Sequence, residues 1–171
     1  MNNYKEWVLG IDPGVHGALS LIEPVSRTII NIWDMPNYSE VLTTGKKRVS
    51  IDVDKLGEIF KTMGFAAAGD DVQIRVQIEK VQAYGKQSAP AAFNFGYAAA
   101  IPYIYCKILE WPVTFISAVS WKKQFGITAT KKDAARLLVI QYFPNHRDYF
   151  TRKMDVDRAD ATLIAMYRGA K

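Results

Sequence analysis

The first part of the chain places short apolar runs between turn residues, which predicts β structure. Apolar runs at residues 7–11 and 18–22 are separated by a short turn that contains Pro13, Gly14 and Gly17. This pattern is typical of a hairpin. A further apolar run at residues 28–35 extends the hairpin to a three-stranded antiparallel meander.

After this meander the pattern changes between loop, helix and strand. Residues 36–50 are polar and have no clear period, so we expect a mobile loop there. Apolar residues at three- and four-residue spacing predict an amphipathic helix over residues 53–63, ended by Gly64. Alternating apolar positions over residues 72–78 predict a strand that ends in Glu79 and pairs in parallel with the first strand.

The second half of the chain is mainly helical in pattern. Residues 89–109 are rich in Ala, Phe and Tyr, and we expect Pro102 to kink or divide this helical stretch. Its small residues allow close approach by a second helix, either from another copy of the chain or from the protein's own core. The remaining expected elements are a strand, a helical turn and two helices, at residues 113–117, 121–125, 132–143 and 157–167.

This order of elements favours an α/β fold in one domain spanning residues 1–171. Three antiparallel strands and additional parallel strands would form a mixed sheet with helices on both faces. A chain of 171 residues is long enough for one well-packed domain and short for two.

Composition excludes several classes of protein. Apolar residues make up 49% of the chain and charged residues 23%, with no long apolar run and no basic, apolar leader. We therefore expect a soluble protein without membrane association, located in the cytoplasm. The single cysteine, Cys106, rules out an internal disulfide and a cysteine metal cluster.

The net charge of +5 is distributed unevenly. Residues 1–79 contain eight basic and eleven acidic residues, whereas residues 80–171 contain fourteen and six. The basic half attracts polyanions, and its paired cations are candidate phosphate contacts, although a solvated surface explains them equally well. These pairs are Lys122 with Lys123, Lys131 with Lys132 and Arg152 with Lys153.

Four acids form the strongest chemical signal. Asp157 and Asp160 stand three residues apart in the last predicted helix, about 60° apart on one face. Asp12 and Glu79 each end an apolar strand, where ligand sites form in open α/β sheets. Carboxylates with water suit Mg²⁺, and two such ions roughly 3.5–4 Å apart hydrolyse phosphodiesters without a nucleophilic side chain.

Each acid also has a simpler explanation when taken alone. Asp157 is favoured at a helix N-terminus, Asp155 suits a helix cap, Asp12 suits a turn, and Glu79 can begin a loop. Other chemistries have little support, because His16 and His146 are isolated and no phosphate-binding loop is present.

Three motifs, in order along the chain, resemble the RuvC-type Holliday junction resolvases, and most closely their phage and prophage members. They are Gly10-Ile11-Asp12-Pro13-Gly14, Ile78-Glu79-Lys80-Val81 and Asp157-Arg158-Ala159-Asp160-Ala161. The segment from Ser88 to Gly96 and the turn Ser120-Trp121-Lys122-Lys123 strengthen the resemblance, which covers nearly the whole chain.

The resemblance implies an RNase H-like fold and a homodimer that cuts two strands of a four-way DNA junction. It implies that Asp12, Glu79, Asp157 and Asp160 are catalytic acids that hold two Mg²⁺ ions, with Mn²⁺ as an alternative. Many phage relatives have a different pair before the last acid, so Asp155 stays a candidate substitute for Asp157.

The resemblance also implies DNA contacts. Family members place an aromatic residue shortly after the glutamate, where this chain has Tyr84, and basic residues near the cut backbone. The candidate DNA-binding residues are Tyr84, Lys86, Lys122, Lys123, Lys131 and Lys132.

We considered three alternatives. An actin-like or sugar-kinase ATPase shares the opening strand but needs two such domains, and a chain of 171 residues disfavours this interpretation. A nuclease of the same fold acting on other branched DNA or on RNA–DNA hybrids is the stronger rival. An inert junction-binding protein would keep the basic half without needing four acids.

Overall fold

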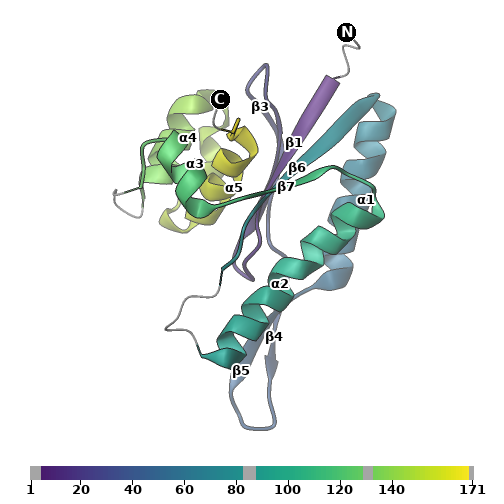
Figure 1. The fold of residues 1–171 in the computed structure, drawn as a ribbon, viewed down its shortest axis with the longest axis vertical. Helices are drawn as coiled ribbons and strands as arrows, with labels where there is room; N and C mark the ends of the chain where they lie inside the picture. The colour runs from purple at the N-terminus through teal and green to yellow at the C-terminus, as the bar shows by residue number, and fades with distance from the viewer. Residues whose placement is uncertain (1–4, 83–87, 129–132, 170–171) are drawn as a thin grey trace.

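A five-stranded mixed sheet forms the centre of the protein (Figure 1), as seen in a computed structural model that describes residues 5–82, 88–128 and 133–169. The strand order is β3-β2-β1-β6-β7, antiparallel on the β3 side of β1 and parallel on the β7 side. Its strands are β1 (Lys5–Asp12), β2 (Ala18–Glu23), β3 (Thr28–Asp34), β6 (Val72–Glu79) and β7 (Val113–Ile116). The predicted meander and the parallel pairing of β1 with β6 are confirmed.

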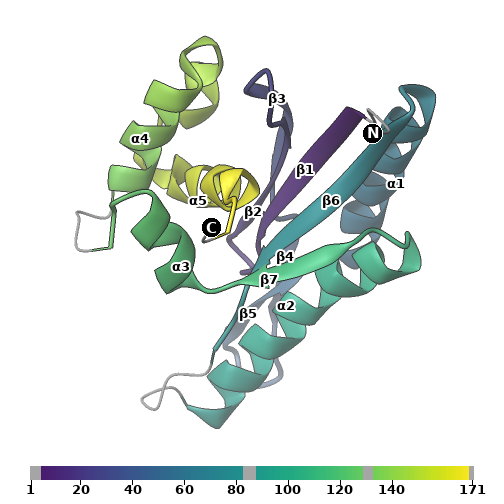
Figure 2. The same cartoon turned by 45° about the horizontal axis from the view of Figure 1, so that its top comes forward.

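Helices cover both faces of this sheet (Figure 2). On one face, α1 (Val53–Gly69) and α2 (Ala89–Ile108) pack over Trp7, Leu9 and Ile11 of β1. On the other face lie α3 (Ala118–Gln124), α4 (Ala134–Tyr142) and α5 (Val156–Met166), with two short 3₁₀ helices at Pro144–Phe150 and Lys153–Asp155. Both faces of β1 are therefore covered, which explains its uninterrupted apolar run.

Residues 37–51 form a hairpin, so the predicted mobile loop is wrong. β4 (Asn37–Val41) and β5 (Lys47–Ile51) pair antiparallel as a separate two-stranded ribbon. Most of its side chains are exposed. A ribbon with little core contact needs no alternating apolar pattern, which is why the sequence showed no period.

One helix boundary also differs from the predictions, and of the two alternatives for Pro102 the division of the helix is wrong. α1 continues past Gly64 to Gly69, because three alanines after Phe65 favour helix and Gly64 keeps a helical conformation. α2 runs through Pro102 as one element. A single glycine or proline is therefore a weaker stop signal than the packing of an apolar helix face on the sheet.

Gly10 lets α5 lie directly against β1. A Cβ atom at this position would collide with the carbonyl oxygen of Ala161 and lie 2.5 Å from the backbone nitrogen of Ala165. Both alanines are fully or almost fully buried. The helix backbone therefore rests on the strand backbone, at a separation that only glycine permits.

We expect Gly10→Ala to lower the free energy of unfolding by roughly 1–3 kcal/mol, because α5 must move away from the sheet. Gly64→Ala in α1 is the matched control, since its new Cβ would lie 3.8 Å from Trp111. That control should raise stability by up to about 1 kcal/mol. Urea denaturation of both variants measures the difference, and equal stability would contradict the close approach.

Candidate active site

Asp12 and Glu79 end two neighbouring parallel strands on the same face of the sheet. Ile11 pairs with Ile78, so the two acids follow side by side at the carboxyl ends of β1 and β6. Ile11 and Ile78 both point into the core beneath α1 and α2. Because successive side chains alternate between faces, Asp12 and Glu79 point to the face covered by α5.

Helix α5 brings the other two acids to this face. Asp157 lies in its first turn and Asp160 in its second, and both are half-buried. Ala161 and Ala165 of the same helix contact Gly10, two residues before Asp12. The close packing of α5 on β1 therefore places Asp160 beside the end of that strand.

The electrostatics of Asp12 show that the four acids converge. The pKa of Asp12 is raised to about 7, first by burial and then by the charges of Glu79, Asp160 and Asp157, in that order, against a backbone hydrogen bond from Gly14. The pKa of Asp160 is also raised to about 7, first by burial, and Glu79 and Asp157 contribute while Lys122 opposes them. Like charges in a poorly solvated place favour a bound cation.

The four carboxylates do not form a closed cage. Within the described residues, no three His, Cys, Asp or Glu side chains are gathered closely enough to hold one metal ion. The acids nevertheless supply only hard oxygen donors, which suits Mg²⁺ or Mn²⁺ with the remaining ligands from water and phosphate.

Helix α3 supplies two side chains to the site. Its Trp121 donates a hydrogen bond from Nε1 to Oε2 of Glu79 at 2.7 Å. Its Lys122 lies 5.0 Å from the centroid of the Trp121 ring and is the cation that opposes the raised pKa of Asp160. Lys122 was expected from the sequence, whereas Trp121 was not, because an apolar residue in a short helix gives no signal of a carboxylate partner.

Asp155 has a different role from the other acids. It is almost fully buried, and it accepts hydrogen bonds from the backbone N–H of Arg152 (2.7 Å) and from that residue's guanidinium (2.7 and 3.0 Å). Although burial raises the pKa of Asp155, these hydrogen bonds from Arg152 hold it below the usual range. Asp155 thereby caps the 3₁₀ turn that leads into α5.

A second arginine ties α5 to the antiparallel side of the sheet. Arg158 donates to both carboxylate oxygens of Asp34 at the end of β3. Because Arg158 lies between Asp157 and Asp160 in sequence, this bidentate pair anchors the acid-bearing turns of the helix.

The candidate DNA contacts are only partly visible. Lys123 is exposed on α3, and Lys122 is half-buried at the acids. Tyr84, Lys86, Lys131 and Lys132 lie outside the described residues, so their roles stay predictions.

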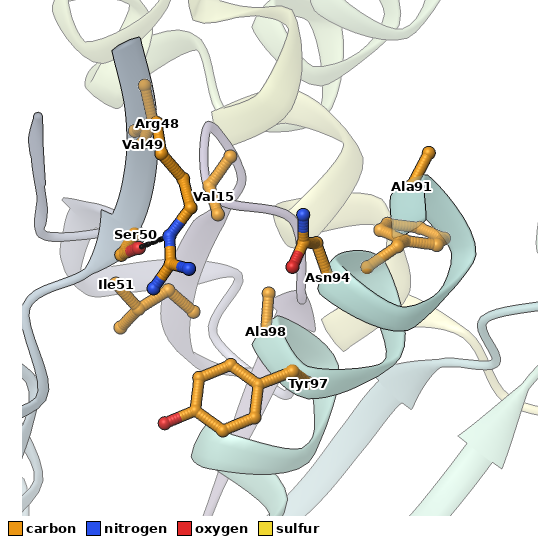
Figure 3. A pocket seen from close by; sticks show the side chains of 10 residues that line it. Val15, Arg48, Val49, Ser50, Ile51, Ala91, Asn94, Tyr97 and Ala98 are labelled. Carbon is orange, nitrogen blue, oxygen red and sulfur yellow. Dashed lines mark hydrogen bonds between the residues drawn. The ribbon is translucent and has the colours of Figure 1, made fainter. Parts of the chain in front are cut away.

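The β4–β5 hairpin begins beside the site. Asn37 donates from Nδ2 to the carbonyl oxygen of Val15, in the loop that follows Asp12. Between the hairpin and α2 lies a hollow of about 230 Å³. Figure 3 shows Arg48 and Ser50 on one side of it and Asn94 and Tyr97 on the other.

None of the helices in the described part of the chain is long and apolar enough to cross a membrane. No protein-family model matches the sequence, and no curated protein matches it.

Two solved structures share the fold over nearly their whole length. RuvC of T. thermophilus in complex with a Holliday junction substrate has a TM-score of 0.52 and 18% identity, covering 94% of this chain and 90% of that chain. Another Thermus thermophilus RuvC structure has the same score and identity, covering 94% and 91%. The predicted RNase H-like mixed sheet is therefore confirmed as the fold.

A third solved structure is less similar. The yeast mitochondrial Holliday junction resolvase Ydc2 has a TM-score of 0.39 and 12% identity, covering 95% of this chain and 77% of that chain.

We expect Asp155→Asn to lower the free energy of unfolding by roughly 1–3 kcal/mol, because it removes the buried charge that pairs with Arg152. Asp148→Asn is the control, since the Asp148 side chain is 95% exposed and makes one ion pair at 4.0 Å. Chemical denaturation of the two variants provides the comparison. Equal stabilities would mean that the Asp155 pair does not support the start of α5.

Proposed function

We propose that this protein is a metal-dependent endonuclease that resolves four-way DNA junctions by paired phosphodiester hydrolysis. The observation that carries the proposal is the convergence of Asp12, Glu79, Asp157 and Asp160 at the carboxyl edge of β1 and β6. The pKa values of Asp12 and Asp160 are both raised to about 7, first by burial and then by the neighbouring acids. An arrangement that is costly without a cation supports a function that uses one.

In this proposal the four acids hold two Mg²⁺ ions, and Mn²⁺ can replace them. When bound, the metal would activate water and stabilise the leaving oxygen. Asp12 and Glu79 would bind from the sheet side and Asp157 and Asp160 from the helix side. We infer that Asp157, and not Asp155, is the fourth ligand, because Asp155 is already held by Arg152.

The chain's own cations complete the site. Lys122 is placed to balance the charge of Asp160, and from there its ammonium can meet a phosphate that enters between the acids. The exposed Lys123 would bind the backbone further out. Tyr84, Lys86, Lys131 and Lys132 are proposed as further DNA contacts, with Tyr84 stacking on a junction base.

Branched DNA is the proposed substrate for two reasons. The fold is shared with a RuvC that was solved with a Holliday junction substrate. In addition, residues 80–171 carry a strong excess of positive charge. The hairpin adds Lys46, Lys47 and Arg48, all exposed, and Arg48 lines the same hollow as Val15 in the loop after Asp12.

Cleavage of two strands of one junction requires two active sites, and we propose that two copies of the chain supply them as a homodimer. The exposed side of α2 is the proposed dimer interface. One stripe of this helix is apolar and exposed, made of Phe93 (74% exposed), Tyr97 (60%), Ile104 (52%) and Ile108 (69%). Four such residues on one side of one helix exceed the scattered exposure of ordinary surfaces. A two-fold axis at this stripe would bury it in both copies.

We also infer that the protein acts in the cytoplasm, in the bacterial host if it is phage-encoded. The support is the DNA substrate proposed above and the resemblance of the motifs to phage and prophage resolvases.

We expect Asp160→Asn to reduce Mg²⁺-dependent cleavage of a synthetic four-way junction by roughly 10³-fold while junction binding persists, since several kcal/mol of transition-state stabilisation are lost. Asp148→Asn changes charge equally at an exposed position and should cleave like the wild type. Gel assays with Mg²⁺, with Mn²⁺ and with EDTA measure the rates.

The same assay separates the rival functions when it includes flaps, Y-forks, RNA–DNA hybrids and linear duplex. Preference for the four-way junction supports the proposal. Preference for another branched DNA or for hybrids would replace it with a related nuclease. Binding without any metal-dependent cleavage would identify an inert junction-binding protein.

We expect the double variant Ile104→Glu with Ile108→Glu to be monomeric, because it places four charges at the proposed two-fold interface. Its junction cuts should become unpaired nicks. Val25→Glu is the control, since Val25 is 90% exposed in the turn between β2 and β3. Light scattering coupled to size-exclusion chromatography reports the mass. A wild-type monomer that still makes paired cuts would rule out this interface.

A further inference from the structure

We propose that Trp121 is a positioning residue, whose indole N–H holds one oxygen of Glu79 and thereby turns the other oxygen toward the acid cluster. This inference rests on the proposed function, because it assigns Glu79 a role as a metal ligand. In this role Trp121 acts through Glu79 and does not bind substrate or metal itself.

The contact is short and its donor is immobile. Nε1 of Trp121 lies 2.7 Å from Oε2 of Glu79, and the indole is completely buried. Its ring belongs to the apolar cluster beneath α4 and α5, which includes Val139 and Leu163. Since neighbouring side chains fill the space around the ring, the N–H can donate in one direction only.

The backbone also fixes the distance between donor and acceptor. Glu79 pairs with Ile116 in the parallel ladder of β6 and β7. Ser117 follows Ile116 directly and is the N-cap of α3, because its hydroxyl accepts from the backbone N–H of Ser120. Trp121 is the next residue after Ser120. The strand that carries the acid and the helix that carries the indole are thus linked within a few residues.

A glutamate at a strand end gains from such a partner. Its side chain has three rotatable bonds, so an unrestrained carboxylate loses conformational entropy when it binds an ion. A charge-assisted hydrogen bond to one oxygen removes part of this freedom in advance. Lys122, the next residue of α3, interacts electrostatically with Asp160. The same turn of α3 therefore contacts Glu79 on the sheet and acts on Asp160 of α5.

Burial of a tryptophan does not by itself explain the contact. Trp7 of β1 is 3% exposed, yet its Nε1 finds no hydrogen-bond partner among the described residues. This fold therefore accommodates a buried indole whose N–H is unused. Trp7 provides a matched control, in which loss of the indole changes packing without touching an acid.

The test compares Trp121→Phe with Trp7→Phe in the full-length protein. Titration calorimetry with Mn²⁺, in the absence of DNA, measures metal affinity, and thermal melting measures stability. We expect Trp121→Phe to weaken Mn²⁺ binding by about 10- to 100-fold, the usual effect of losing a hydrogen bond to a metal ligand. Trp7→Phe should keep wild-type affinity whatever its melting temperature.

The dependence of cleavage on Mn²⁺ concentration is a second measurement, and a change in packing alone should leave it unchanged. The Mn²⁺ concentration for half-maximal cleavage of a four-way junction should rise for Trp121→Phe, with the rate at saturating Mn²⁺ changing less. If Trp121→Phe does not fold, benzothienylalanine incorporated at position 121 keeps the bicyclic shape and replaces the N–H by sulfur. It should weaken Mn²⁺ binding in the same way.

The outcomes separate this inference from the proposed function. Wild-type metal affinity in the position-121 variants would overturn the role of Trp121 alone. A wild-type protein that binds Mn²⁺ but cleaves no branched DNA would overturn the proposed function, while the affinity difference would still support Trp121. A wild-type protein that does not bind Mn²⁺ would overturn both.

Discussion

The candidate site depends on the close approach of helix α5 to strand β1. Gly10 has no Cβ, and the small side chains of Ala161 and Ala165 let the two backbones come together there. Asp12 stands two residues further along the strand, and Asp160 stands next to Ala161 on the helix. A larger residue at any of these contacts would separate the two halves of the acid cluster, because its side chain would push the helix away from the strand.

That repulsion is balanced by groups drawn from several elements. Burial and like charges raise the pKa values of Asp12 and Asp160, and Lys122 offsets part of the effect on Asp160. Arg158 and Arg152 hold the start of α5 through Asp34 and Asp155. The apolar packing on both faces of the sheet therefore stabilises an arrangement that electrostatics opposes, which is a usual condition of functional sites.

Much of the fold could be predicted from the sequence because its signals were local. The alternating or continuous apolar runs predicted the meander and the β6 strand, and the motifs pointed to the right fold. The hairpin at residues 37–51 was missed, since a mostly exposed ribbon carries no apolar period. The end of α1 was also misplaced, because packing on the sheet outweighs one glycine.

The sequence alone determined which residue types could form the site: two acids at strand ends and two on one helix face. It could not decide between Asp155 and Asp157, because both suit the start of a helix. The structure shows that Asp155 caps a local turn through Arg152, three residues before it. Only the tertiary structure brought the Trp121 indole to Glu79, 42 residues away in the chain. Spacing along a chain sets which face a residue occupies, whereas contacts between distant elements depend on how those elements pack.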